Sequence, residues 1–133
     1  MHRRTLMALG LGALTITPFG AGSALAQTPP QAVKISVLFG QPKSAAEFER
    51  HYAAVHMPML RAVAGIQRIE LATPVALEPG VAPPFYRITE MWFASMAQMD
   101  AVTGTPAWQQ IVADVPKFAS GGATVLVSVI AAE

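Results

Sequence analysis

Two histidines and a tyrosine lie close together in residues 48–60, and they are the side chains best suited to acid–base chemistry. His51, Tyr52 and His56 fall within thirteen residues that also hold a proline. An imidazole with an unperturbed pKa of about 6.5 can take up and release a proton near neutral pH. Asp114, in the last turn of a second predicted helix, is the carboxylate best placed to orient such a histidine. These residues predict a catalytic group made of His51, His56 and Asp114.

Each of these residues also has a structural interpretation. His51 could be a boundary residue at the edge of the buried face of its helix. His56 could stabilise the C-terminal end of that helix, where the dipole favours an imidazolium. Asp114 could be a solvated acid at a helix end. The sequence alone leaves these alternatives open.

The element that must position the histidines is a helix that begins after Ser44. Ser44 and Glu47 have the spacing of a capping box, which predicts the helix start. Pro58 disfavours helical geometry before it, so we expect the regular helix to end near His56. The apolar residues that recur at helical spacing, and so predict the buried stripe, are Phe48, Tyr52, Val55 and Met59.

The spacing of the two histidines argues against a metal centre. At about 100° per residue, side chains five positions apart on an α-helix diverge by about 140°, so His51 and His56 should not share one ion. Cysteine is absent, which excludes thiolate ligands and cysteine nucleophiles. No glycine-rich strand-to-helix loop indicates a nucleotide site. We therefore expect neither a metal nor a cofactor.

The rest of the chain predicts an α+β domain. After the linker, the order of elements is βαββαβ, which is the ferredoxin-like arrangement of a four-stranded antiparallel sheet with two helices on one face. Gly104 interrupts the second helix, and Thr105 with Pro106 restarts it. Alternating or valine-rich segments predict strands at residues 33–39, 65–77, 85–93 and 124–130.

The predicted layers leave one side of the sheet uncovered and create a pocket on the other. An uncovered sheet face usually marks an interface, so we expect a homodimer. Between helices and sheet we expect a pocket lined by Phe48, Tyr52 and Trp108, with the histidines at its rim. Apolar walls with a few polar groups suit a small apolar or aromatic molecule.

Two segments resemble the EthD family, a branch of the dimeric α+β barrel proteins. Asp114-Val115-Pro116-Lys117-Phe118, followed by glycines and a valine-rich strand, is similar to that family's closing segment. The resemblance spans residues 33–131 and implies a dimeric α+β barrel. The residues that match the family's first-helix signature are Phe48, His51, Tyr52, His56, Pro58 and Leu60.

The first 26 residues are typical of a secretory signal peptide. His2, Arg3 and Arg4 precede an apolar run, and small residues ending at Ala26 give the cleavage site. The arginine pair resembles a twin-arginine signal, although an ordinary Sec signal would also fit. We expect residues 27–32 to be a linker, residues 33–133 to be the domain, and the mature protein to lie in the periplasm.

The charge of the mature chain excludes two classes of partner. Without Arg3 and Arg4, seven basic and eight acidic residues remain. No basic patch favours nucleic acid, and no polybasic arm favours adsorption to a membrane.

Three classes of function remain. The first is a cofactor-independent enzyme in which His51 or His56 moves a proton on a small compound. The EthD resemblance implies a reductase, oxidoreductase or isomerase type of activity. The second is a periplasmic binding or accessory protein for an apolar ligand such as haem or an aromatic compound. The third is an interaction module with a vestigial pocket.

Overall fold

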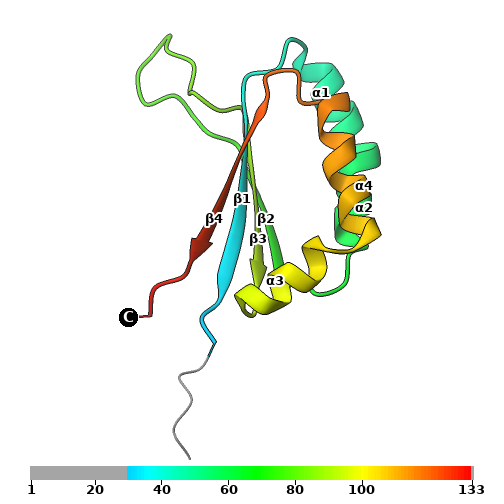
Figure 1. The fold of residues 1–133 in the computed structure, drawn as a ribbon. Helices are drawn as coiled ribbons and strands as arrows, with labels where there is room; N and C mark the ends of the chain where they lie inside the picture. The colour runs from blue at the N-terminus through cyan, green and yellow to red at the C-terminus, as the bar shows by residue number, and fades with distance from the viewer. Residues whose placement is uncertain (1–29, 133) are drawn as a thin grey trace, which may run out of the picture.

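Strand β1 (Val33–Phe39) lies in the middle of a four-stranded sheet, between β3 (Arg87–Phe93) and β4 (Ala123–Val129). The computed structural model describes residues 30–132 of the chain. The short strand β2 (Arg68–Ala72) completes the order β2-β3-β1-β4, and every neighbouring pair is antiparallel. All helices pack on one side of this sheet (Figure 1). The predicted ferredoxin-like α+β fold is thus confirmed.

Two helical regions cover the sheet. The region nearer the C-terminus consists of α3 (Met96–Thr103) and α4 (Pro106–Asp114), followed by the 3₁₀ turn η2 (Val115–Lys117). Ser95 and Thr105 cap the starts of α3 and α4 with their side-chain oxygens, as their positions in the sequence indicate. The first region is one continuous helical segment made of α1 (Ala45–His51), the π-helical turn η1 (Tyr52–His56) and α2 (Met57–Arg61).

The first helix does not end near His56, contrary to our expectation. In η1 the backbone N–H of Met57 bonds to the carbonyl oxygen of Tyr52, five residues earlier. Pro58 then falls at the start of α2, where a missing N–H costs least. The proline is therefore accommodated and the helix continues to Arg61.

The π-helical turn also shifts the buried face of the helix by one residue. Val55, predicted to be buried, is 41% exposed. His56 and Leu60 are buried where a regular helix would have placed Val55 and Met59. Phe48 and Tyr52, which precede the shift, are buried as predicted. The extra residue in η1 thus moves His56 from the edge of the stripe into it.

Two strands are shorter than predicted. Strand β2 was expected over residues 65–77 but pairs only over Arg68–Ala72, and the segment containing Pro74 leaves the sheet as a loop. Proline lacks the N–H that a ladder requires, which fits the early end of this strand. Strand β3 begins at Arg87 rather than residue 85, and its buried residues Thr89 and Met91 belong to the helix-covered side.

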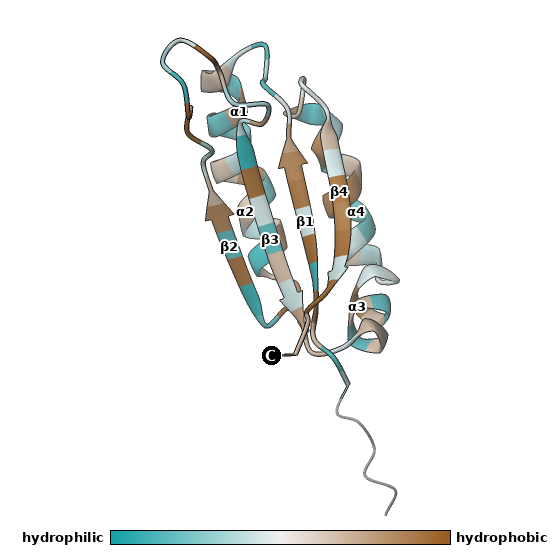
Figure 2. Ribbon diagram, turned by 90° about the vertical axis from the view of Figure 1, so that its left-hand side faces the viewer, coloured by the Kyte–Doolittle hydropathy of each residue, from teal (hydrophilic) through white to brown (hydrophobic). Residues whose placement is uncertain are grey.

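The side of the sheet away from the helices is open (Figure 2). Its central part is polar: Glu90 lies 2.7 Å from the Lys34 ammonium and accepts a hydrogen bond from Ser36. The Arg68 guanidinium lies 4.2 Å from the centre of the Trp92 ring. Leu126, paired with Ser36 in the register, is 49% exposed. This face therefore combines fixed charges with uncovered apolar surface.

No helix within residues 30–132 is long and apolar enough to cross a membrane. The predicted signal peptide and residues 27–29, half of the predicted linker, lie outside the described residues.

Candidate functional site

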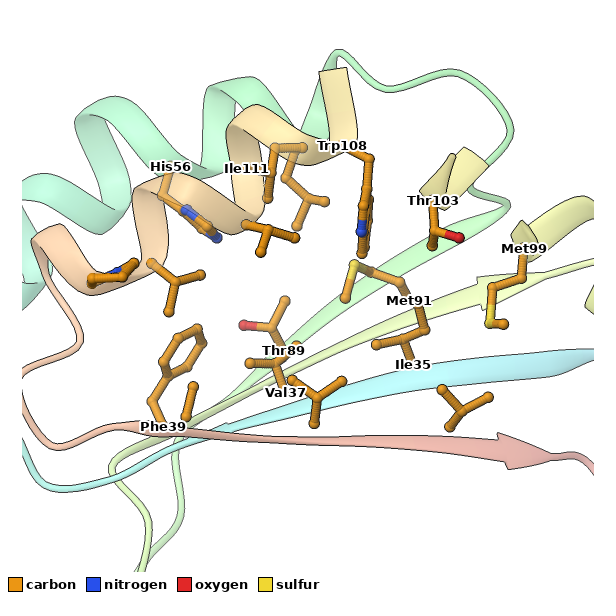
Figure 3. A pocket seen from close by; sticks show the side chains of 17 residues that line it. Ile35, Val37, Phe39, His56, Thr89, Met91, Met99, Thr103, Trp108 and Ile111 are labelled. Carbon is orange, nitrogen blue, oxygen red and sulfur yellow. The ribbon is translucent and has the colours of Figure 1, made fainter. Parts of the chain in front are cut away.

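A cavity of about 440 Å³ lies between the sheet and the helices (Figure 3). Its polar groups belong to His56, Thr89, Thr103 and the indole N–H of Trp108, and the described residues that line it include no charged side chain. Such a wall suits a small, largely apolar molecule. The apolar lining consists of Ile35, Val37, Phe39, Leu60, Met91, Met99, Trp108, Ile111, Val112, Val115, Pro116, Ala123, Val125 and Val127.

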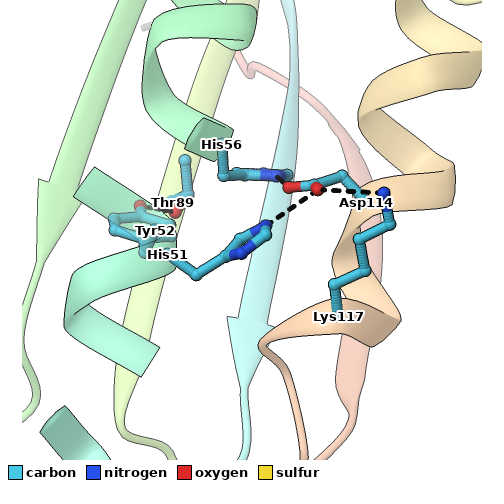
Figure 4. Close-up of polar contacts among 6 residues, drawn as sticks. All are labelled: His51, Tyr52, His56, Thr89, Asp114 and Lys117. Atoms are coloured by element: carbon cyan, nitrogen blue, oxygen red, sulfur yellow. Dashed lines mark hydrogen bonds and ion pairs between the residues drawn. The ribbon is translucent and has the colours of Figure 1, made fainter. Parts of the chain in front are cut away.

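His56 forms part of the cavity wall and is 4% exposed. Its Nδ1 lies 3.0 Å from Oδ2 of Asp114, which comes from the end of α4 (Figure 4). The imidazole stacks on the Tyr52 ring, with centroids 5.8 Å apart. Packing on one side and a hydrogen bond on the other hold the ring in one orientation.

His51 approaches the same carboxylate from one turn earlier in the helix. Its Nε2 lies 2.8 Å from Oδ1 of Asp114 (Figure 4). The ring stacks on Phe118 and does not line the cavity. The His51 side chain is 20% exposed, so it connects the buried carboxylate with the protein surface.

Asp114 is the buried centre of this group, with 3% of its surface exposed. Burial alone would raise the pKa of its carboxyl group, but the hydrogen bonds from His51 and His56 outweigh burial and hold the pKa below its usual value. An ionised carboxylate only accepts hydrogen bonds. His56 Nδ1 must therefore donate, which leaves Nε2 as the nitrogen without a hydrogen in the neutral ring.

Burial lowers the pKa of His56, and the hydrogen bond and charge of Asp114 only partly oppose this effect. The neutral imidazole is thus favoured near neutral pH. A neutral histidine with one nitrogen fixed on a carboxylate and the other free to accept a proton has the features of a general base.

The structure brings His51, His56 and Asp114 together, as the predicted roles require. Trp108, expected in the pocket, is part of the cavity wall. Phe48 and Tyr52 are not part of the wall and instead belong to a buried aromatic cluster behind it, with ring centroids 5.3 Å apart. The single-residue shift in η1 turns His56 toward the cavity, so the histidine lines the wall while the two aromatic rings lie behind it.

Sequence reasoning missed Thr89, whose hydroxyl oxygen lies 2.5 Å from the Tyr52 hydroxyl. Its position was available from the alternation of β3, which places Thr89 on the helix-covered side. A polar residue on the same strand face as the buried residues Met91 and Phe93 was the signal that could have identified it.

Among residues 30–132, no group of three or more His, Cys, Asp or Glu side chains is arranged to hold a metal ion. His51 Nε2 and His56 Nδ1 are each within hydrogen-bond distance of Asp114.

Comparison with known proteins supports one family. Residues 40–122 match the EthD domain. An uncharacterised 11.0 kDa protein of Rhodococcus erythropolis, from the thcB-thcC intergenic region, is 29% identical over 93 residues, which cover 70% of this chain and 89% of that protein.

Several solved structures share the fold. An ethyl tert-butyl ether degradation (EthD) family protein from Bacillus halodurans superposes with a TM-score of 0.67 at 25% identity, covering 73% of this chain and 96% of that one. A hydroxynitrile lyase from Passiflora edulis gives 0.60 at 23% identity, with 77% and 96% covered. A dimeric ferredoxin-like protein of unknown function from Thermobifida fusca gives 0.58 at 8% identity, with 76% and 92% covered.

Proposed function

The chain belongs to the EthD family, and on that premise we propose that it is an enzyme in which His56, oriented by Asp114, moves a proton on a small apolar or aromatic compound. One observation carries the proposal: a buried histidine, fixed through Nδ1 on a carboxylate, forms part of the wall of an apolar cavity. Removing a proton from a bound compound is the first step of isomerase-type chemistry and needs no cofactor.

The cavity sets the size of the compound. A volume of 440 Å³ corresponds to about fifteen water-sized groups, at about 30 Å³ each. A compound with one or two rings would fill it. The hydroxynitrile lyase from Passiflora edulis has the same fold, which supports an enzymatic use of this architecture by analogy alone.

His51 has a supporting role in this proposal. It holds the second oxygen of Asp114 at 2.8 Å and reaches the surface. A proton taken up by His56 is stabilised by the carboxylate that both histidines share.

The test is to identify the compound and then to remove the base. Native mass spectrometry of the protein from its own cells would reveal a bound compound, and conversion of that compound would then be followed in the wild type and in His56→Gln. We expect the variant to turn over about 10²- to 10⁴-fold more slowly. Val55→Ala, on the exposed side of the same turn, is the matched control and should leave turnover unchanged.

The same comparison separates an enzyme from a binding protein. Equal turnover in wild type and His56→Gln would rule out the proposed base. A compound that binds tightly and is never converted would favour the alternative, a periplasmic binding or accessory protein for an apolar ligand such as haem or an aromatic compound.

Export to the periplasm is part of the proposal, supported by the signal-like sequence of residues 1–26. Replacing Arg3 and Arg4 with lysine should stop export through the twin-arginine route. Normal export of this variant would discard that route, and retention of an unprocessed chain in the cytoplasm in wild type would discard export.

A further inference from the structure

The cavity offers a bound compound three polar groups that could contact it, namely the His56 ring, the Thr89 hydroxyl and the Trp108 indole N–H. The hydroxyl of Thr103, its fourth polar side chain, lies 3.4 Å from the Asp100 carbonyl oxygen of its own helix. Of the three groups, His56 and Thr89 are the two that a further side chain connects. Figure 3 shows the His56 ring on the helical side of the cavity and the Thr89 hydroxyl on the sheet side, both toward the same space.

Tyr52 links these two groups from behind the cavity wall. Its ring stacks on the His56 ring with an angle of 19° between the planes, and its hydroxyl oxygen lies 2.5 Å from Oγ1 of Thr89. Tyr52 and Thr89 are both buried. The three side chains therefore form a packed unit, and neither polar group can turn away from the cavity without disturbing it.

The direction of the Tyr52–Thr89 hydrogen bond follows from a neighbouring charge. The Arg87 guanidinium lies 5.0 Å from the centre of the Tyr52 ring and is anchored to Glu49. A guanidinium can only donate hydrogen bonds, and its positive charge repels the phenolic hydrogen. Burial raises the pKa of the Tyr52 hydroxyl, whereas hydrogen bonding and charge from Arg87 both act to lower it. Arg87 therefore favours Tyr52 as the donor to Thr89 Oγ1, an arrangement that leaves the hydrogen of the Thr89 hydroxyl free for the cavity.

We propose that Thr89 donates this hydrogen to an oxygen atom of the bound compound, so that the site selects neutral compounds carrying a hydroxyl or carbonyl group within reach of both Thr89 and His56. The inference rests on the proposed function, because it uses the same cavity. It goes further by assigning a specificity residue on β3 and the chemical class of the compound.

Because the lining residues carry no charge, the chemical class of compound that the cavity can bind is narrower still. A carboxylate, phosphate or ammonium group would lose its hydration in this cavity and find no opposite charge on the wall. A hydrocarbon without oxygen would leave the Thr89 hydroxyl without a partner. A neutral compound with one oxygen beside an apolar ring avoids both costs.

The test compares two probes of nearly the same shape, 2-naphthol and 2-methylnaphthalene. Both should bind the purified protein, and 2-naphthol should bind about threefold to tenfold more tightly, as one added hydrogen bond contributes. In Thr89→Val, which keeps the shape but removes the hydroxyl, this preference should fall while the affinity for 2-methylnaphthalene is unchanged. Thr89→Ser restores the hydroxyl and should restore the preference.

Each other outcome is decisive. Equal affinity for both probes in the wild type, or an unchanged preference in Thr89→Val, would overturn the role of Thr89 and leave the proposed proton transfer by His56 standing. If Thr89→Val does not fold, Thr89→Ser and Thr89→Ala take its place, and a preference retained by Thr89→Ala overturns the inference. Failure of both probes to bind the wild type would overturn this inference and the proposed ligand cavity together.

Discussion

His51 and His56 lie five residues apart in one helix, yet both place a ring nitrogen on the same carboxylate. On a regular α-helix their side chains would diverge by about 140°. The π-helical turn Tyr52–His56, with hydrogen bonds that span five residues, brings them to one face. One inserted residue thus creates the site, because without it His56 would lie at the edge of the buried stripe.

This origin predicts that one residue can be removed from the turn without loss of the fold. Deleting Ala54, an exposed residue in η1, would leave the histidines four apart, the spacing that lies on one face of a regular α-helix. The buried stripe of the shortened helix would then have regular helical spacing. It would consist of Phe48, Tyr52, His56 and Leu60. We expect the protein to stay folded with both histidines on Asp114, as read from their ring ¹⁵N shifts, and to lose stability only because Pro58 would then lie inside a regular helix.

A deletion in α4 is the control. Gln110 is equally exposed, but α4 is a regular helix, so its removal would rotate Ile111 and Asp114 by about 100° away from the core. That protein should unfold or lose several kcal/mol of stability, as expected when buried side chains are displaced. Loss of the contacts between the histidines and Asp114 after the Ala54 deletion would contradict the explanation of the π-helical turn.

Asp114→Asn should impair both stability and the proposed chemistry. An amide oxygen can accept from only one histidine, and the amide nitrogen would donate to the other, which leaves the buried network poorly matched at a cost of about 1–3 kcal/mol. Donation to Nδ1 of His56 would move its hydrogen to Nε2 and remove the base, so turnover should fall about 10²- to 10⁴-fold.

Asp100→Asn, on the exposed side of α3, is the control and should change neither the stability nor the turnover. Unchanged turnover in Asp114→Asn would exclude Asp114 as the orienting group.

The sequence predicted the fold well because its signals are local. Alternation in β1 and β3, and the capping residues Ser95 and Thr105, determine those elements wherever they pack. The segment 65–77 was predicted too long because its residues also suit a strand, whereas strand pairing stops before Pro74.

The site was harder to predict because it depends on one irregular turn. No residue type in Tyr52-Ala53-Ala54-Val55-His56 specifies a π-helical turn, so regular geometry was applied and Val55 was assigned to the core. Asp114 could be proposed from its place at a helix end. Its contacts with His51 and His56 follow only from how α4 and the first helix pack on the sheet.

The pH dependence of stability should report the buried state of His56. Burial lowers the pKa of His56 in the folded protein, while the unfolded imidazole keeps a pKa of about 6.5. Below that pH the unfolded chain binds more protons than the folded one, so the free energy of unfolding should fall as the pH falls. Urea unfolding at pH 7 and pH 5.5 should show this decrease in the wild type and a smaller one in His56→Gln. The ionisation of Asp114, with its pKa lowered from 3.8, lies below this range. An identical decrease in both proteins would contradict a lowered pKa of His56.

The final prediction concerns the open face of the sheet, which we propose is covered by a second copy of the chain. The face carries Leu126 at 49% exposure beside the Lys34–Glu90 ion pair, and an uncovered face with apolar surface usually marks an interface. Leu126→Lys would bury an unpaired ammonium in such an interface, at a cost that few interfaces tolerate. Light scattering at micromolar concentration should give a dimer for the wild type and a monomer for Leu126→Lys.

Val55→Lys is the control. It changes a side chain of similar exposure and should remain dimeric, because Val55 lies on the helical side of the protein and not on the open face of the sheet. A wild-type monomer at this concentration would exclude the dimer, and equal dissociation of both variants would place the interface elsewhere.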